Sequence, residues 1–361
     1  MSLKRIAELA GTSISTVSRV LHSPEHRCHN QELYRRIWEI AEQEHYLPNS
    51  AARELRKGRK DSETPFVVDI LLTRFESMDK DSFFLELFHY TEEELIENGC
   101  LLGEVLNLPD IMALEREATN TRNVPYRSQA NVQSERQLNP SAFIVRKKNT
   151  GLLIFGKCPA EVISILRKRY AYIVGIDRNP TEYEYDEVIC NGAAAASMAV
   201  EYLISLGHSN IAYIGDCNYE SRYIGYYQTL LKHKIPLRYS DVHQTSQTEQ
   251  EGFRVMQEIM QEESKPTAIF CANDSTALGV LRALKQNKKR GYVPSVISID
   301  NITESQKSTP MLTTIHIPKK EMVHLAIRLL LDRKDGLHQE RVRLELPCRL
   351  LERESCTYYN G

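Results

Sequence analysis

Near its start the chain carries short hydroxyl side chains beside a single arginine, in the run AGTSISTVSRVL at residues 10–21. On a helix that lies in a DNA groove, hydroxyls can reach phosphates and base edges, and an arginine can form two hydrogen bonds with guanine. This pattern therefore indicates sequence-specific contact with DNA. The candidate contact residues are Ser13, Ile14, Ser15, Thr16, Ser18 and Arg19.

A second group of polar residues follows short apolar runs in the later part of the chain: Asp177, Asp216, Asn273 with Asp274, and Asp300. In folds built on parallel sheets, ligands bind at the carboxyl ends of the strands. Carboxylates and amides in such places can hold a polar small molecule. Asp and Asn also end strands and start turns without binding anything, so both interpretations stay open for each residue singly.

The DNA-contact candidates need a small helical framework to position them. Residues 3–10, LKRIAELA, have apolar side chains at helical spacing, Gly11 permits a tight turn, and Ser13 can cap a second helix. Two short helices joined by such a turn predict a helix-turn-helix, whose second helix enters the major groove. The alternative interpretation is an amphipathic helical hairpin with no DNA role.

A third helix and a short hinge segment are expected next. Asn30 can cap the third helix, Pro48 breaks the chain direction, and Asn49 can cap a further helix at residues 50–57. A helix this short is marginal by itself in water, so we expect it to form only when a partner orders it. Residues 1–60 hold 11 Lys or Arg and 7 Asp or Glu, whereas the whole chain has a net charge of −2. A basic head on an acidic body fits a small DNA-binding module joined to a larger domain.

From residue 65 on, apolar runs alternate with helical stretches, which predicts an α/β body with parallel sheets. The runs are too many for one compact sheet, so two α/β lobes are expected. Residues 107–150 are polar with little periodicity, and we expect an exposed surface insertion with one helix near 110–118. The expected strands lie at 66–72, 100–106, 151–156, 171–177, 210–216, 268–274 and 295–300, and one helix at 83–97.

LKRIAELAGTSISTVSRVL and YLPNSAAREL resemble the head and hinge of the LacI/GalR family of transcriptional repressors. The segments LGHSNIAYIGD, SRYIGYYQTL, PTAIFCANDSTALGVLRAL and PMLTTIHIP resemble the periplasmic-binding-protein-like body of the same family. The resemblance implies an all-α helix-turn-helix head (1–49), a hinge helix and linker (50–60), and a two-lobed effector-binding and dimerisation domain (61–361). It also implies chain crossovers between the lobes near 177–190, 300–315 and 332–340.

The resemblance further implies roles for individual residues. Leu55 would wedge into the minor groove at the operator centre and kink the duplex, and Asn49, Ala52 and Arg53 would lie beside it. A small effector, most simply a sugar, would bind in the cleft between the lobes. The sequence departs from the family at RCHN (27–30), at Asn191 and in SVISIDN, which lacks the usual glycine. The effector-contact residues implied by the match are Phe83, Phe84, Asp177, Arg222, Asn273 and Asp300.

The sequence thus predicts a cytoplasmic, homodimeric repressor of a sugar-utilisation operon that binds a pseudo-palindromic operator and is controlled by a sugar-type effector. The segment KNTGLLIFGK and the polar insertion resemble the galactoside-operon branch of the family. No cofactor, metal or membrane is expected, because the eight cysteines are scattered and no long apolar run occurs. Enzyme motifs such as the P-loop are missing. The alternative is a stand-alone sugar-binding protein of the periplasmic type, which would need a signal peptide and no basic head.

Overall fold

The computed structural model describes residues 9–12, 33, 35–37, 40, 65–73, 81–113, 147–177, 179–218, 220–287 and 291–359. In the head, Leu9 and Ala10 are helical, and Gly11 takes a φ of 65°, the conformation that the predicted turn requires. Ile37 and Ala10 are buried. All predicted DNA contacts lie outside the described residues: Ser13, Ile14, Ser15, Thr16, Ser18, Arg19, Asn49, Ala52, Arg53 and Leu55.

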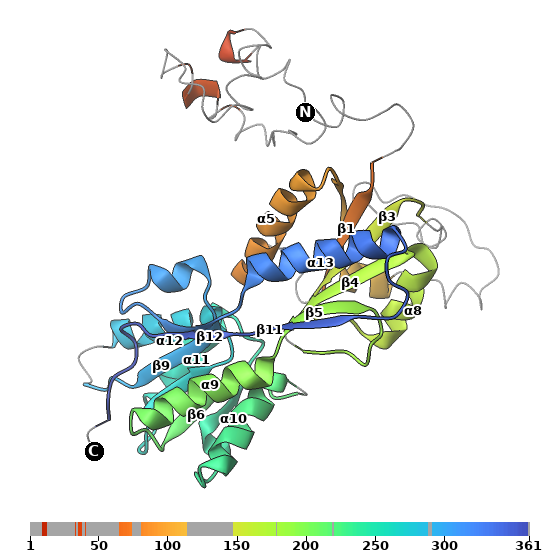
Figure 1. Cartoon of the computed structure of the whole chain (residues 1–361). Helices are drawn as coiled ribbons and strands as arrows, with labels where there is room; N and C mark the ends of the chain where they lie inside the picture. The colour runs from red at the N-terminus through yellow and green to blue at the C-terminus, as the bar shows by residue number, and fades with distance from the viewer. Residues whose placement is uncertain are drawn as a thin grey trace, which may run out of the picture. The chain divides into compact units, whose positions relative to one another are not determined.

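Within the described residues, the body contains two six-stranded sheets, which define its first and second lobes (Figure 1). The first sheet has the strand order β11-β5-β4-β3-β1-β2, and its β1–β3, β3–β4, β4–β5 and β5–β11 pairs are parallel. Its strands are β1 (Val67–Leu72), β2 (Leu101–Asn107), β3 (Thr150–Phe155), β4 (Tyr172–Asp177), β5 (Asp186–Cys190) and β11 (Arg343–Leu346).

The second sheet has the order β12-β10-β9-β8-β6-β7 and is parallel except for the antiparallel pair of β10 and β12. Together the two sheets confirm the predicted α/β class and the two lobes. The strands are β6 (Ile211–Gly215), β7 (Val242–Gln244), β8 (Ala268–Cys271), β9 (Ser295–Asp300), β10 (Thr313–His316) and β12 (Arg349–Leu351).

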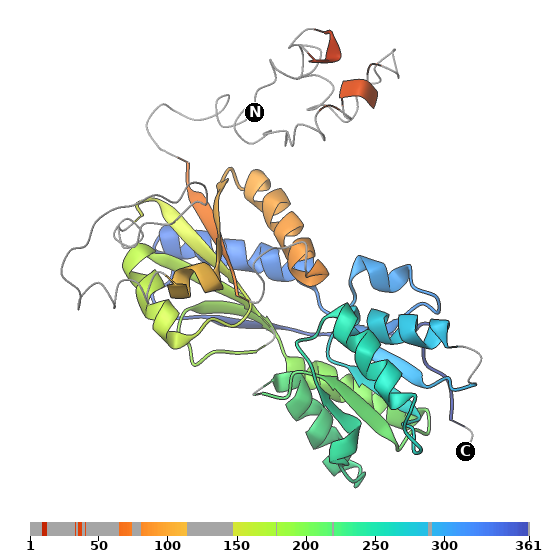
Figure 2. The same cartoon turned by 180° about the vertical axis from the view of Figure 1, so that it is seen from behind.

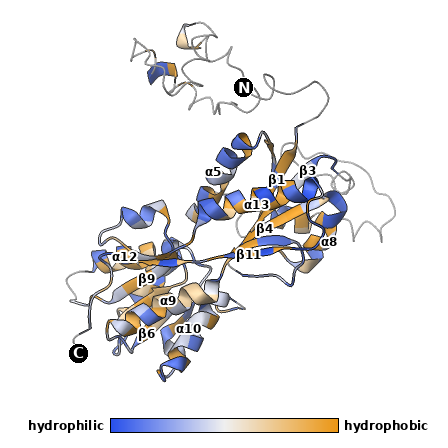
Figure 3. Cartoon of the chain, in the orientation of Figure 1, coloured by the Kyte–Doolittle hydropathy of each residue, from blue (hydrophilic) through white to orange (hydrophobic). Residues whose placement is uncertain are grey.

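Helices cover the sheets because the central strands, such as β3, β6 and β9, are buried on both faces. The views from opposite sides show α13 over one face of the first sheet and α8 over the other (Figures 1 and 2). In Figure 3 the strands are mostly hydrophobic, whereas the helices carry hydrophilic stretches. The helices of the body are α5 (Ser82–Glu97), α8 (Ala160–Arg169), α9 (Gly192–Ser205), α10 (Ser221–Lys232), α11 (Glu249–Ile259), α12 (Asp274–Gln286) and α13 (Lys319–Lys334).

Two glycines set the close packing of α11 and α12. A Cβ at Gly252 would lie 2.1 Å from the Thr276 carbonyl oxygen, and one at Gly279 would lie 2.0 Å from that of Glu249. No side chain fits there, so glycine is what lets the two helices approach. The apolar faces of both helices join one buried cluster with β6, β8 and β9. This cluster holds the amino end of α12 near the carboxyl edge of the sheet.

The chain passes between the lobes three times. It crosses after Cys190, at the end of the predicted range 177–190, then between His316 and Lys319, and finally between Leu346 and Arg349. The last two crossovers lie later than the predicted ranges 300–315 and 332–340. The second crossover comes later because β10 still pairs with β9 in the second sheet. Only the next element, α13, packs on β4 of the first sheet.

The predicted insertion is only partly described. Residues 108–113 are helical, close to the helix expected near 110–118, and residues 114–146 lie outside the described part. Among the described helices, none has the length and apolar character needed to cross a membrane.

Candidate small-molecule site

Arg222, near the amino end of α10, is the largest fully buried side chain of the described residues. Its Nε donates to Glu220 Oε1 at 2.7 Å, its Nη1 to the Ala272 carbonyl at 2.8 Å, and its Nη2 to Gln247 Oε1 at 2.9 Å. Burial alone would lower the pKa of Arg222, but the Glu220 carboxylate beside it raises that pKa above its usual range. The guanidinium is therefore a fixed positive charge.

Asn273 caps α12 and is tied to the same loop as Arg222. Its Oδ1 accepts hydrogen bonds from the Thr276 backbone NH at 3.0 Å and from Thr276 Oγ1 at 2.6 Å. Its Nδ2 donates to the Gln247 carbonyl at 3.0 Å. Gln247 thus holds Arg222 through its side chain and Asn273 through its backbone.

Gln247 is a site residue that was not predicted from the sequence. It is buried and has a φ of 66°, in the left-handed region that non-glycine residues seldom adopt. The only signal in the sequence was its place in the polar segment TSQT after a short strand. A polar segment of this kind is typical of any surface loop, so it does not single out a buried residue.

Asp300 completes this cluster from the end of β9. It is buried, with a φ of 130°, and its carboxylate contributes to the raised pKa values of both Arg222 and Asp274. The structure therefore brings three predicted residues together, Arg222, Asn273 and Asp300, at the carboxyl edge of the second sheet. Arg222 comes from α10, Asn273 from the N-cap position of α12 and Asp300 from the end of β9.

The predicted aromatic pair lies at the start of α5 in the first lobe. Asp81 Oδ1 accepts from the backbone NH groups of Phe83 and Phe84 at 3.0 and 3.3 Å, which fixes this helix end. Both rings are buried. The Phe84 ring packs towards Phe155, with 6.2 Å between ring centroids, so it belongs to the core of the first lobe.

Phe83 instead faces a cation, since the Lys319 ammonium lies 5.4 Å from its ring centroid. Asp177, the remaining predicted residue, ends β4 and is half-buried opposite Ile189 of β5. Asp177, at a carboxyl strand end, and Phe83 come from the first lobe. Arg222, Asn273 and Asp300 belong to the second lobe.

Lys319 and Glu86 connect the two lobes near this site, and neither was predicted from the sequence as a site residue. The buried Lys319 ammonium donates to the carbonyls of Asp300 at 2.6 Å and Asn301 at 3.1 Å, and pairs with Glu86 at 3.0 Å. Glu86 also accepts from the backbone NH and the hydroxyl of Thr303, at 2.7 and 2.8 Å. These groups connect α5 of the first lobe to the loop after β9 of the second.

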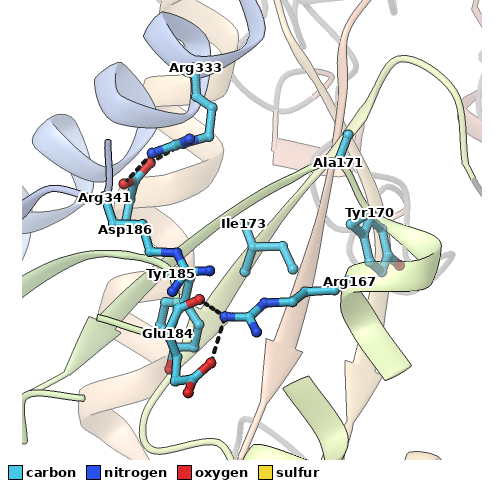
Figure 4. A pocket seen from close by; sticks show the side chains of 9 residues that line it. All are labelled: Arg167, Tyr170, Ala171, Ile173, Glu184, Tyr185, Asp186, Arg333 and Arg341. Carbon is cyan, nitrogen blue, oxygen red and sulfur yellow. Dashed lines mark hydrogen bonds and ion pairs between the residues drawn. The ribbon is translucent and has the colours of Figure 1, made fainter. Parts of the chain in front are cut away.

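A separate hollow of about 280 Å³ lies in the first lobe, at the amino ends of β4 and β5 (Figure 4). It is therefore at the opposite edge of that sheet from Asp177. Two of its arginines are paired with acids: Arg333 donates to both carboxylate oxygens of Asp186, and Arg167 binds Glu184 at 2.5 Å. The third, Arg341, donates to the Tyr183 backbone carbonyl. The two ion pairs hold the strand ends in place.

In the described part of the chain, no group of three His, Cys, Asp or Glu side chains is arranged so that it could hold a metal ion. What the arrangement around Arg222 offers is a set of fixed hydrogen-bonding groups at a strand edge. Such a set can orient a polar small molecule.

Two protein-family descriptions match this chain, one at its start and one in its later part. Residues 2–49 match the family described as "Bacterial regulatory proteins, lacI family", and residues 200–356 match "Periplasmic binding protein-like domain". A "HTH-type transcriptional repressor PurR" from Klebsiella pneumoniae (strain 342) is 28% identical over 366 residues, covering 98% of this chain and 96% of its own.

Two solved structures share the fold. The structure described as "transcriptional regulator CelR-cellobiose complex" has a TM-score of 0.64 at 21% identity, with 99% of this chain and 100% of the other covered. The lac repressor dimer bound to operator and the anti-inducer ONPF has a TM-score of 0.64 at 19% identity, with 99% of each chain covered. At these identities the likeness concerns the fold.

Proposed function

Because the chain belongs to the LacI family of DNA-binding transcriptional regulators, we propose that it represses a sugar-utilisation operon under the control of a sugar-type effector. The family assignment confirms that the protein is a regulator with a ligand-binding domain and is not an enzyme. It also disfavours the alternative of a stand-alone sugar-binding protein, since such a protein would not carry the head matched at 2–49.

The observation that carries the proposal is the convergence of Arg222, Asn273 and Asp300 on one sheet edge, where Gln247 holds the first two and the Asp300 carboxylate lies near the Arg222 charge. Carboxylates, amides and guanidinium groups bind paired hydroxyls, and the Phe83 ring can face the apolar side of a pyranose. Arg222 is paired with Glu220 and Lys319 with Glu86, so the charges of both cations are already balanced by carboxylates of the protein. We therefore propose a neutral polyhydroxylated effector rather than a phosphorylated one.

The proposed control couples this site to the DNA head through the lobes. An effector bound between the lobes would change the contacts of Glu86 with Thr303 and Lys319. The distances between the chain segments that connect the two lobes would then change as well. In the proposed homodimer, two hinge segments carrying Leu55 would lie over the centre of a pseudo-palindromic operator. A coupling free energy of about 1–3 kcal/mol between two sites is typical of allosteric proteins.

A thermal-shift screen of the full-length protein tests the effector class. We expect a neutral sugar, with cellobiose and galactosides among the first to try, to raise the unfolding midpoint. At a hundredfold excess over Kd the stabilisation is about 2.7 kcal/mol. Asp300→Asn should weaken the shift, whereas Asp335→Asn, an exposed carboxylate on the surface, should not. A screen in which only phosphorylated compounds stabilise the protein would contradict the proposed effector class.

A substitution in the head tests the proposed base contact. Arg19→Ala should reduce operator affinity by about 1–3 kcal/mol, with the loss concentrated at one base pair, because a bidentate arginine reads a single guanine. The measurement is a binding titration against operators that differ at single positions. A loss that is the same on every sequence would show that Arg19 contacts a phosphate and would refute its assignment to base readout.

A further inference from the structure

Two cysteines meet where the chain crosses between the lobes. Cys190 is the last residue of β5, directly before the crossover into α9, and Cys348 lies in the crossover between β11 and β12. The parallel register of β5 and β11 places Leu346 opposite Cys190, so Cys348 follows only two residues further along the neighbouring segment. The two side chains share a thiol hydrogen bond, and both are reduced.

The two thiols differ in solvent accessibility, so an oxidant would reach Cys348 before Cys190. Cys348 is partly accessible, whereas Cys190 is fully buried. The hydrogen bond from the Cys190 thiol lowers the pKa of Cys348 to about 7, so a large part of Cys348 is thiolate at neutral pH. In contrast, burial raises the pKa of Cys356 to about 12, and its thiol donates to the Val296 carbonyl.

We propose that Cys348 and Cys190 form a peroxide-sensitive thiol pair that closes into a disulfide and ties together two of the segments connecting the lobes. The Cys348 thiolate attacks one oxygen of hydrogen peroxide and becomes a sulfenic acid, while the other oxygen leaves and takes up a proton to form water. The Cys190 thiol then attacks the Cys348 sulfur, which releases the second water and forms the S–S bond. Hydrogen peroxide supplies the two oxidising equivalents.

The disulfide between Cys190 and Cys348 would restrict movement of one lobe relative to the other, because it lies at the boundary between them. Both segments run from the first sheet towards the second lobe, and the crossover at 346–349 is only a few residues long. Fixing one to the other at the lobe boundary removes their freedom to slide or separate. In a reducing compartment such a bond is transient, which fits a redox-sensing role.

The test is mild hydrogen peroxide treatment of the full-length protein, followed by digestion and mass spectrometry without reductant. We expect a peptide pair linked through Cys190 and Cys348, a mass loss of about 2 Da in the intact protein for the two hydrogens removed, and reversal by dithiothreitol. Amide hydrogen exchange at residues 344–350 should slow several-fold in the oxidised protein and recover on reduction.

Matched variants separate this pair from general oxidation. Cys356→Ser, which removes another partly accessible cysteine, should leave the linked peptide unchanged, whereas Cys348→Ser should abolish it. Cys190→Ser keeps a hydrogen-bond donor beside Cys348 and should leave Cys348 as a sulfenic acid that reagents can trap. Cys190→Ala removes that donor, so Cys348 should be oxidised more slowly and again without a link. Oxidation of Cys348 in the unaltered protein to sulfinic acid with no link to Cys190, or a link to a different cysteine, would overturn the proposal.

Discussion

Replacing Arg222 with alanine is expected to destabilise the second lobe by about 3–5 kcal/mol, the cost typical of breaking a buried ion pair by removing one partner. The substitution leaves the buried Glu220 carboxylate without its guanidinium, and leaves the Ala272 carbonyl and Gln247 Oε1 without their donor. Urea unfolding, followed at several pH values, measures the loss. The proposed effector response should also disappear, since the same side chain lies in the proposed site.

Two further variants show whether the ion pair is the cause. Arg254→Ala removes an exposed arginine paired with Glu258 on α11 and should change the free energy of unfolding by less than about 0.5 kcal/mol. In the double variant Arg222→Met with Glu220→Gln, no uncompensated charge stays buried, so the loss should be smaller than in Arg222→Ala. If Arg222→Ala unfolds at the same urea concentration as the unaltered protein, the structural role of this ion pair is refuted.

Asp274 is expected to make the protein less stable as the pH rises from about 4 to about 6. Burial, and then the nearby Asp300 carboxylate, raise the pKa of Asp274 from 3.8 to about 6. The folded protein therefore holds a proton that the unfolded chain has already released, and this advantage is lost as the pH passes the folded pKa. At 1.36 kcal/mol per pKa unit, the change is about 3 kcal/mol.

The Asp274→Asn variant isolates this contribution from all other titrations. Its amide keeps the carboxylate shape, and its oxygen can accept from the Ile302 NH while its NH₂ donates to the hydroxyls of Ser298 and Thr314. The free energy of unfolding of the variant should fall less steeply between pH 4 and 7 than that of the unaltered protein. The exposed Asp335→Asn should follow the unaltered curve, and an Asp274→Asn curve parallel to it would contradict the prediction.

Much of the body could be predicted because its signals are local. Short apolar runs ended by Asp or Asn indicated the strands, and Asn273 and Asp300 lie at strand ends as expected. In the head, Gly11 adopts the positive φ that its turn requires. Arg222 was predicted as an effector contact only from the resemblance to the family, because its position inside a helix gives no sign of a binding role by itself.

What could not be predicted depends on residues that are far apart in the chain. Lys319 and Glu86 are separated by more than two hundred positions, and only the folded lobes bring them together. The same is true of Cys190 and Cys348, which are neighbours because β11 joins the sheet beside β5. The second crossover was placed too early for a related reason, since the partner strand of β10 is set by sheet order and not by its own residues.

The central claim is that one small molecule controls sequence-specific DNA binding by this protein. The most direct measurement takes the full-length protein, selects its preferred DNA from random sequences, and titrates that DNA with and without the sugar found by thermal shift. We predict binding to the selected sequence at least about 10³-fold tighter than to unrelated DNA, and a change of about 5- to 150-fold in this affinity when the sugar is added. Equal affinity for all DNA, or an operator affinity unchanged by the sugar that stabilises the protein, would contradict the claim.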